Sequence, residues 1–153
     1  GLPYPIRAIR TSEFLYIHNF APDRWPAGDP AGIDDLDIEA PSCDKILSDT
    51  RVAYADMDGS PTKAWMIHHR GEAEIQPLFQ VGFGKRPKEE LYDLRVDPDH
   101  MNNVSGAPEY QGDLNYLADT LMEVLRANDD PRLVEFKCRF EHAPYAGPLL
   151  EDT

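Results

Sequence analysis

Apolar and polar positions near the start of the chain follow the period of a β-strand. Residues 6–11 and 14–20 are two β-rich runs separated by Ser12 and Glu13, a spacing that predicts a hairpin. Successive strand side chains point to opposite faces. One face should therefore carry Phe14, Tyr16, His18 and Phe20, and the other Leu15, Ile17 and Asn19. Because both faces carry apolar groups, we expect one to be covered by a helix of this chain and the other by something outside it.

The strongest helical signal lies in residues 108–127. Its apolar positions recur at helical spacing and form one stripe, made of Leu114, Leu117, Ala118, Leu121, Met122 and Leu125. The opposite side carries Asp113, Asp119 and Glu123. Burial of each leucine would contribute about 1.5–3 kcal/mol. The pattern predicts a long helix that packs across the sheet.

Two more stretches are typical of strands. Residues 90–94 read ELYDL, and residues 133–141 alternate apolar and charged side chains. In the second stretch Val134, Phe136, Cys138 and Phe140 would face inward. The expected fold class is α+β, in a single domain over residues 1–153: a small antiparallel sheet of hairpin 6–20, strand 90–94 and strand 133–141, with helix 108–127 packed on it and long ordered loops.

The middle of the chain predicts short helices and a long loop. Ser60 before Pro61 is typical of a helix start, and this helix should run to about residue 70. Residues 44–49 could form a helical turn capped by Ser42, and residues 73–84 an irregular segment or short helix. Residues 21–41 are rich in Pro, Gly and Asp, and we expect an ordered loop that docks through Trp25.

Composition excludes several classes of function. The 153 residues are 41% hydrophobic, which suits a globular chain, and the formal net charge is -13. Such a surface repels phosphate backbones, so nucleic acid is not an expected partner. It also repels a sulfated polysaccharide unless cationic residues cluster at a site. No run of about 18 apolar residues is present, so no membrane span is expected.

No motif in the sequence predicts a metal site. The stretch from Asp56 to Gly59 is similar to an EF-hand loop, but its first and last ligand positions would fall on Tyr54 and Trp65, which cannot serve. A turn explains it better. The acidic residues 34–39 predict an exposed loop. His68 and His69 point about 100° apart on a helix, so they do not share a metal easily.

Nucleophile motifs are also missing from the sequence. It contains no G-x-S-x-G and no phosphate-binding loop. The two cysteines, Cys43 and Cys138, lack the features of a reactive thiolate. We expect two buried thiols, and a disulfide between them remains open if the compartment is oxidising.

Three stretches, taken in order, resemble a known family. They are RAIRTSEFLYIHNF at residues 7–20, DMDGSPTK at residues 56–63 and RPKEELYDLRVDPDHMNNV at residues 86–104, with F-x-x-x-P-Y at residues 140–145 closing the series. Together they resemble the C-terminal subdomain of bacterial sulfatases, closest to the branch of heparan N-sulfatase (sulfamidase), in the alkaline-phosphatase-like superfamily. The resemblance covers most of residues 4–148.

The resemblance implies a C-terminal fragment of a larger enzyme. In that family a larger α/β domain carries a C/S-x-P-x-R motif, whose Cys or Ser becomes formylglycine, and a calcium ion held by Asp and Asn side chains. Neither Cys43 nor Cys138 lies in such a motif. The resemblance therefore implies a sulfuric ester or sulfamate hydrolase whose catalytic residues, calcium and formylglycine belong to a missing N-terminal domain, with no catalytic or metal-binding residue in this chain. It also implies a periplasmic or secreted protein.

The resemblance implies that this chain contributes to the rim of the active-site pocket. In the sulfamidase-like branch the loop after the hairpin approaches the active site, which here is residues 22–30. Arg24 could pair with a substrate sulfate or carboxylate, Trp25 could stack on a sugar and Asp29 could accept hydroxyl hydrogen bonds. Lys63 is a further substrate-binding candidate. Alternatively, the loop docks on the large domain.

Two alternative functions stay open. The chain could be a free-standing acidic binding module that uses the Pro-rich loop. Within the superfamily, phosphate and phosphonate monoester hydrolases share the architecture, and the C-terminal part does not decide which ester is cut. As a sulfatase fragment the chain would expose apolar surface, and alone it should oligomerise or aggregate.

Overall fold

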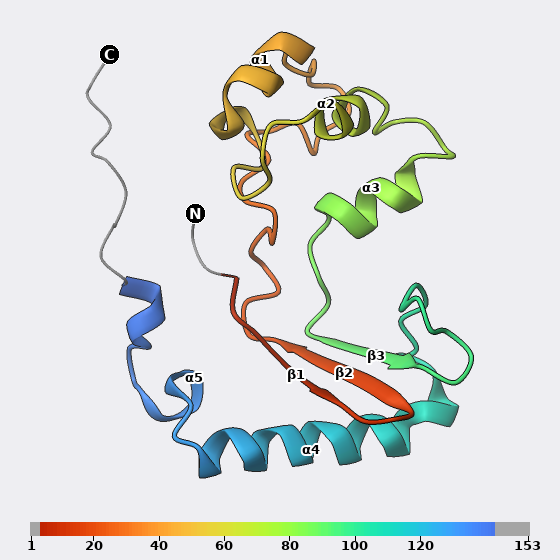
Figure 1. The fold of residues 1–153 in the computed structure, drawn as a ribbon, viewed down its shortest axis with the longest axis vertical. Helices are drawn as coiled ribbons and strands as arrows, with labels where there is room; N and C mark the ends of the chain where they lie inside the picture. Colours follow the sequence, from red (N-terminus) through yellow and green to blue (C-terminus); the bar gives the residue numbers. More distant parts are fainter. Residues whose placement is uncertain (1–3, 143–153) are drawn as a thin grey trace.

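A three-stranded antiparallel sheet lies at one end of the molecule and a group of short helices at the other (Figure 1). The computed structural model describes residues 4–142. The strands are β1 (Ile6–Arg10), β2 (Phe14–Asn19) and β3 (Glu89–Asp93), in the order β1-β2-β3. The predicted hairpin and the ELYDL strand are therefore confirmed. Residues 21–84, which we name the helical lobe, are inserted between β2 and β3.

One sheet face packs against α4 (Gln111–Ala127), which runs beneath the strands (Figure 1). A turn of 3-10 helix, η2 (Pro108–Tyr110), precedes it. The sheet and helix share a core of Phe14, Tyr16, Leu91, Leu114, Leu117, Leu121 and Leu125. These leucines belong to the stripe that the helical period predicts. The predicted packing of the long helix across the sheet is thus confirmed, and with it the α+β class.

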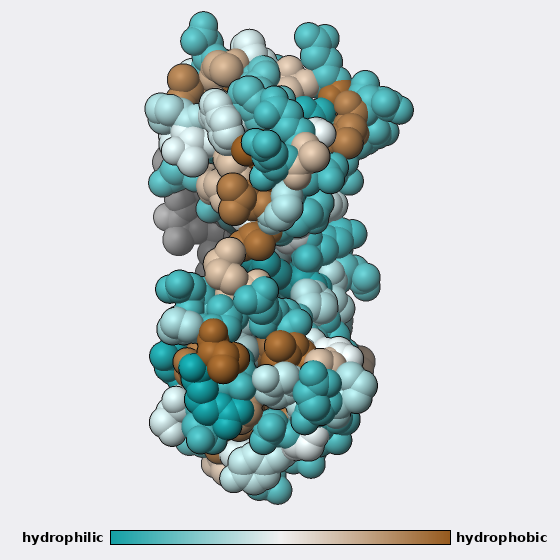
Figure 2. Space-filling view, turned by 90° about the vertical axis from the view of Figure 1, so that its right-hand side faces the viewer, coloured by the Kyte–Doolittle hydropathy of each residue, from teal (hydrophilic) through white to brown (hydrophobic). Residues whose placement is uncertain are grey.

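The helical lobe has a second core of its own. Its elements are α1 (Cys43–Ser48), η1 (Thr50–Val52), α2 (Pro61–His68) and α3 (Gln76–Phe83). Tyr54 is fully buried at its centre and makes edge-on contacts with Phe79 and Phe83. As predicted, Ser42 and Ser60 cap α1 and α2. The space-filling view shows a narrower waist between this lobe and the sheet end (Figure 2).

The outer edge of β3 is closed by the segment that follows the strand. The amide of Leu91 donates to the side-chain Oδ1 of Asn103 at 2.9 Å, and the amide of Val104 donates to the Leu91 carbonyl at 2.8 Å. The hydroxyl of Ser105 donates to the Glu89 carbonyl at 3.1 Å. An unpaired sheet edge can pair with another chain. Here the segment after β3 bonds backbone groups of Glu89 and Leu91 at this edge without forming a fourth strand.

The expected strand over residues 133–141 is wrong. That segment holds α5 (Pro131–Val134) and η3 (Arg139–His142), and Phe136 is 99% exposed. The cause is local: Asp130 accepts from the amide of Arg132 and Pro131 occupies the first helical position, so a helix start replaces the strand. Charged side chains of the segment form ion pairs instead, namely Glu135 with Arg139 and Glu141 with Arg132.

Two further sequence predictions concern the closing motif and membrane spans. The closing F-x-x-x-P-Y motif extends past residue 142 and so lies partly outside the described residues. Within residues 4–142, no helix is both long enough and apolar enough to cross a bilayer.

Candidate functional site

A pocket of about 390 Å³ opens on the sheet face opposite α4. We call it the sheet pocket. Its apolar lining comes from the strands and from the helical lobe, namely Ile6, Leu15, Ile17, Pro26 and Val81. Its polar lining is Tyr4, Asn19, Arg86, Glu90, Tyr92 and His100. We expected something outside the chain to cover this face, but segments of the chain itself already close part of it.

A buried carboxylate forms the polar centre of the sheet pocket. Glu90 is only 6% exposed. Its Oε1 accepts a hydrogen bond from Asn19 Nδ2 at 2.8 Å, and its Oε2 accepts one from the Tyr92 hydroxyl at 2.6 Å. Burial and the hydrogen bond to Glu90 raise the pKa of Tyr92. Glu90 is therefore an anchored acceptor, since both its oxygens are already bonded.

Two residues that line the sheet pocket each carry a buried polar atom without a partner in the described part of the chain. The hydroxyl of Tyr4 and Nε2 of His100 are buried, and neither makes a hydrogen bond within the described part of the chain. Burial, with the charge of Glu90 as the next cause, raises the pKa of Tyr4. Buried polar groups are nearly always hydrogen-bonded in folded proteins, and the Tyr54 hydroxyl in the core of the helical lobe is in the same state.

The Asp-Pro turn after β3 sets the position of His100. Asp97 is 9% exposed, and its carboxylate accepts from the amides of Met101 at 3.1 Å and Asn102 at 2.8 Å. Within this turn, His100 adopts a left-handed backbone conformation with φ of 56°. Its ring centroid lies 6.0 Å from that of Tyr92. The turn thus holds the imidazole against the sheet pocket.

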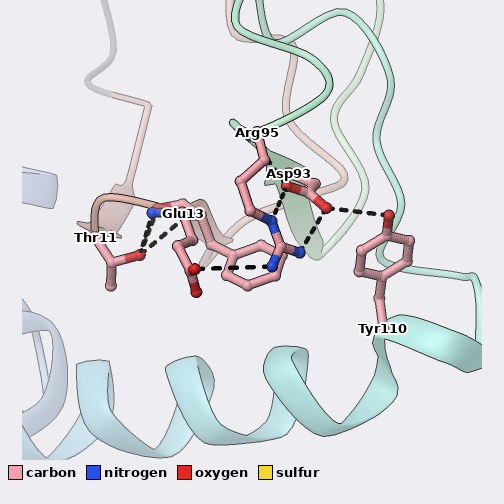
Figure 3. Close-up of polar contacts among 6 residues, drawn as sticks. Thr11, Glu13, Asp93, Arg95 and Tyr110 are labelled. Atoms are coloured by element: carbon pink, nitrogen blue, oxygen red, sulfur yellow. Dashed lines mark hydrogen bonds and ion pairs between the residues drawn. The ribbon is translucent and has the colours of Figure 1, made fainter.

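The Asp of ELYDL ties the sheet to the start of α4 (Figure 3). Asp93 accepts from Arg95 Nε at 2.8 Å and Nη2 at 2.7 Å, and from the Tyr110 hydroxyl at 3.2 Å. The hydrogen bond from Arg95 lowers the pKa of Asp93 to about 2. The same guanidinium lies 4.7 Å above the Phe14 ring and 3.8 Å from Glu13. Asp93 therefore has a structural role.

The loop residues proposed for the rim lie partly beside the sheet pocket. Pro26 lines it, whereas the neighbouring Trp25 docks edge-on against Tyr54 with Lys85 Nζ 5.0 Å over its ring. The expected docking of Trp25 thus occurs within the chain. Arg24 Nη1 donates to Glu141 Oε2 at 2.7 Å and is 41% exposed. These geometries leave the substrate-binding prediction for Arg24 and Trp25 open.

The other two candidates are engaged in the helical lobe. Asp29 is exposed, and its Oδ1 accepts from the amide of Ala31 at 2.7 Å. Lys63 is 2% exposed, and its Nζ donates to the carbonyls of Thr50, Tyr54 and Met57 at 3.2, 3.1 and 2.8 Å. Because an ammonium has three donors, none remains for a substrate. Burial lowers the pKa of Lys63. This geometry supports a structural role for Lys63, and its proposed contact with a substrate stays a prediction.

The cysteines and acidic side chains form no obvious centre. Both cysteines are free thiols; Cys138 is buried as expected, but Cys43 is exposed, which corrects the expectation of two buried thiols. In the part of the chain that the structure describes, no three His, Cys, Asp or Glu side chains are grouped so that they could hold a metal ion.

Comparison with known proteins adds no relative. No protein-family model matches the chain, and the searches of curated proteins and of solved structures found no match. Any assignment therefore depends on the motifs and on the geometry described above.

Sequence reasoning missed the sheet pocket. Leu15, Ile17 and Asn19 were placed on one face by their spacing, and cross-strand pairing then adds Glu90 opposite Ile17 and Tyr92 opposite Leu15. That register could have suggested a buried carboxylate beside apolar groups. Tyr4 and His100 reach the pocket from non-strand segments, and no period in the sequence predicts that.

Proposed function

We propose that the chain is the C-terminal part of a sulfatase-type hydrolase that cleaves sulfate esters or N-sulfate groups, on a sugar. One observation carries this proposal: the hairpin, the ELYDL strand and the leucine-striped helix pack into one unit around a shared core. The hairpin and the ELYDL strand lie in two of the stretches that resemble sulfatases. With the helix they form the antiparallel sheet and packed helix that the resemblance implies.

Three residues of the stretch that resembles sulfatases have structural roles. Asp93 binds Arg95 and Tyr110, Asp97 caps the turn after β3, and Asn103 closes the edge of β3. A motif of this kind specifies how the subdomain is built. This supports an assignment in which the chain has the family's motif yet contributes no catalytic residue.

In this proposal the chemistry belongs to an upstream catalytic part. That part supplies the formylglycine nucleophile and the calcium ion, and the present chain completes the fold and shapes the rim. Arg24 and Trp25 are the rim residues, because a planar guanidinium suits a sulfate and an indole suits a sugar face. Exposed apolar side chains on the helical lobe, including Leu36, Leu47 and Leu78, offer a surface for the catalytic part.

The gene provides a direct test. The coding sequence upstream of residue 1 should encode C/S-x-P-x-R, and mass spectrometry of the purified longer product should find formylglycine at its first position. A variant with Ala at that position is the control, since it cannot be converted. A gene that encodes only this chain, or an upstream region without that motif, would contradict the proposal.

One observation favours a second candidate, a free-standing binding module. The sheet pocket is assembled entirely from segments of this chain, so a ligand site does not require another domain. The same upstream sequence separates the two functions.

A further inference from the structure

We propose that the open edge of β1 binds an extended segment of a partner protein, which adds an antiparallel strand to the sheet and places one carboxylate against Arg10. This edge is separate from the rim loop, and the inference does not depend on the sulfatase proposal. It rests on the unpaired backbone groups of β1, the regularity of the strand and the charge beside it.

The hydrogen bonds of the hairpin show which backbone groups of β1 face outward. At the turn, the amide of Thr11 donates to the Phe14 carbonyl at 2.9 Å. In an antiparallel pair, residues bonded to the neighbouring strand alternate with residues that are not, and the register between β1 and β2 is continuous. The residues of β1 whose amides and carbonyls point to the outer edge are therefore Ile6, Ala8 and Arg10.

These outward groups are largely unpaired. Ala8 and Arg10 are exposed, and within residues 4–142 their amides and carbonyls make no hydrogen bond. The Ile6 carbonyl accepts from Arg7 Nη1 at 2.8 Å but has a second lone pair. The opposite edge of the sheet differs, because the segment after β3 bonds the outward backbone groups there. Strand addition is therefore expected at β1 and not at β3.

The strand β1 lacks two of the features by which proteins block an exposed edge. Prolines and bulges are common ways to prevent a further strand from pairing. The sequence of β1, IRAIR, contains no proline, and each of its residues pairs with one residue of β2, so the strand has no bulge. Of its two arginines, Arg7 is held by Asp130, with Nε 2.7 Å from Oδ2. A regular strand can therefore pair along the whole edge.

The second arginine, Arg10, determines the charge of the partner strand. It is exposed, and no residue in the described part of the chain forms an ion pair with it. Its planar guanidinium suits a carboxylate on the added strand, whereas a cation directly opposite would be repelled. The net charge of the chain is -13, which disfavours a partner segment with many carboxylates. The same charge disfavours a second copy of this chain as the occupant, because two copies repel each other.

The register also predicts the order of side chains on the added strand. Antiparallel pairing is slightly more stable per residue than parallel pairing. An antiparallel partner runs from Arg10 toward Ile6, so its carboxylate comes first and an apolar side chain follows four positions later. That side chain lies beside Ile6, which is 43% exposed, and removes apolar surface from water. With β-branched residues between them, the expected motif is of the type Glu-Val-Val-Thr-Ile.

The test is a matched series of peptides on the 153-residue chain. Acetyl-Ser-Glu-Val-Val-Thr-Ile-Ser-amide is compared with versions that have Gln or Lys in place of Glu. Titrations followed by amide proton–nitrogen NMR spectra should show shifts at Ile6, Ala8 and Arg10, with slower hydrogen exchange at the Ala8 amide. The Lys peptide should bind about three- to tenfold more weakly than the Glu peptide, the effect of one exposed charge contact and its reversal. The Gln peptide should lie between them.

Methylation of single peptide nitrogens separates strand addition from contacts of side chains alone. The second Val of the peptide lies opposite Ala8, so its amide points at β1, and methylation there should abolish binding. The amide of the first Val points away from β1. Methylation of that nitrogen is the matched control and should largely preserve binding.

Variants of the chain locate the binding. Arg10→Glu should reverse the preference, so that the Lys peptide binds more tightly than the Glu peptide. Lys45→Glu makes the same change of charge at an exposed position on α1 and should keep the parent preference. Ala8→Pro removes an amide that makes no bond to β2 and should abolish peptide binding, since proline is tolerated where a strand amide faces outward. Arg10→Glu and the methylated peptides still give an answer if Ala8→Pro fails to fold.

Several results would overturn the inference. They are no shift up to the solubility limit of the Glu peptide, shifts that map away from β1, equal affinity for the Glu and Lys peptides, equal effects of the two methylations, or the parent preference in Arg10→Glu. Sedimentation of the chain without peptide tests the other occupant: a dimer that Ala8→Pro dissociates would assign the edge to a second copy and reject a partner protein. Binding to the 153-residue chain that is absent in a longer gene product would assign the edge to the upstream part and reject it too.

Discussion

Arg95 donates to both carboxylate oxygens of Asp93, with Nε 2.8 Å from Oδ1 and Nη2 2.7 Å from Oδ2. The pair lies at the end of β3, where Tyr110 joins it from the turn before α4 (Figure 3). Bidentate contacts of this kind fix geometry as well as charge. The sheet and α4 are therefore linked by a polar contact in addition to their apolar core.

The pKa of Asp93 predicts acid sensitivity. Folding lowers it from about 3.8 to about 2, so the ionised group stabilises the fold fully above pH 3.8, and this contribution is lost as the pH falls through about 2. In urea titrations between pH 5 and pH 2, the free energy of unfolding of the parent chain should fall more steeply than that of Asp93→Asn. The exposed Asp119→Asn serves as control and should keep the parent slope. Parallel slopes for the parent and Asp93→Asn would contradict the prediction.

The edge of β3 depends on a side-chain acceptor. Asn103→Ala removes the partner of the Leu91 amide and should lower the free energy of unfolding by about 1–2 kcal/mol. Hydrogen exchange at Leu91 should also accelerate. The neighbouring Asn102→Ala is the matched control, because only its backbone amide is bonded. Equal losses in the two variants would remove the proposed role of the Asn103 side chain.

The buried ammonium of Lys63 predicts a larger loss. Lys63→Met keeps the length of the side chain but leaves three carbonyls without their donor, so we expect about 2–3 kcal/mol of destabilisation in urea. Lys45→Met, at an exposed position, should change little. A Lys63→Met chain as stable as the parent would show that the three hydrogen bonds contribute nothing net.

The stripe of α4 can be tested by truncation. Leu117 is 2% exposed in the shared core, and Leu117→Ala should cost about 2–5 kcal/mol in the free energy of unfolding. Val124 lies on the same helix but is 48% exposed, so Val124→Ala should cost about 0.5 kcal/mol or less. Similar losses at the two positions would argue against the packing described.

The sequence predicts well what local periods and caps decide. The alternation of Phe14 and Tyr16, the leucine stripe of α4 and the serine caps of α1 and α2 all correspond to observed elements. The same rule failed at residues 133–141, where the Asp130 cap and ion pairs outweighed a strand-like alternation. A prediction from alternation alone ignores helix caps, which can favour a helix over a strand in the same segment.

The candidate site was much harder to predict. Tyr4, Glu90 and His100 come from segments distant in sequence and meet only because the sheet and the Asp-Pro turn bring them together. Lys63 was a further candidate for substrate contact, although a lysine is rarely as buried as this one is. Its burial follows from the three carbonyls of a loop, which side-chain patterns do not reveal.

The rim proposal makes a kinetic prediction. In the longer gene product, Arg24→Met should raise KM for a sulfated saccharide by about tenfold, because it removes a charge-assisted contact. The same substitution should barely change the free energy of unfolding, since the ion pair between Arg24 and Glu141 is partly exposed. Arg126→Met, at an exposed position on α4, is the control. An unchanged KM in Arg24→Met would assign the loop a structural role only.

The most direct measurement is hydrolysis of 4-nitrophenyl sulfate and 4-nitrophenyl phosphate by the gene product that contains this chain and its upstream sequence. The account predicts cleavage of the sulfate ester in preference to the phosphate, and loss of that activity when the Cys or Ser of C/S-x-P-x-R is replaced by Ala. Preference for the phosphate ester, or sulfate hydrolysis that survives the replacement, would contradict it.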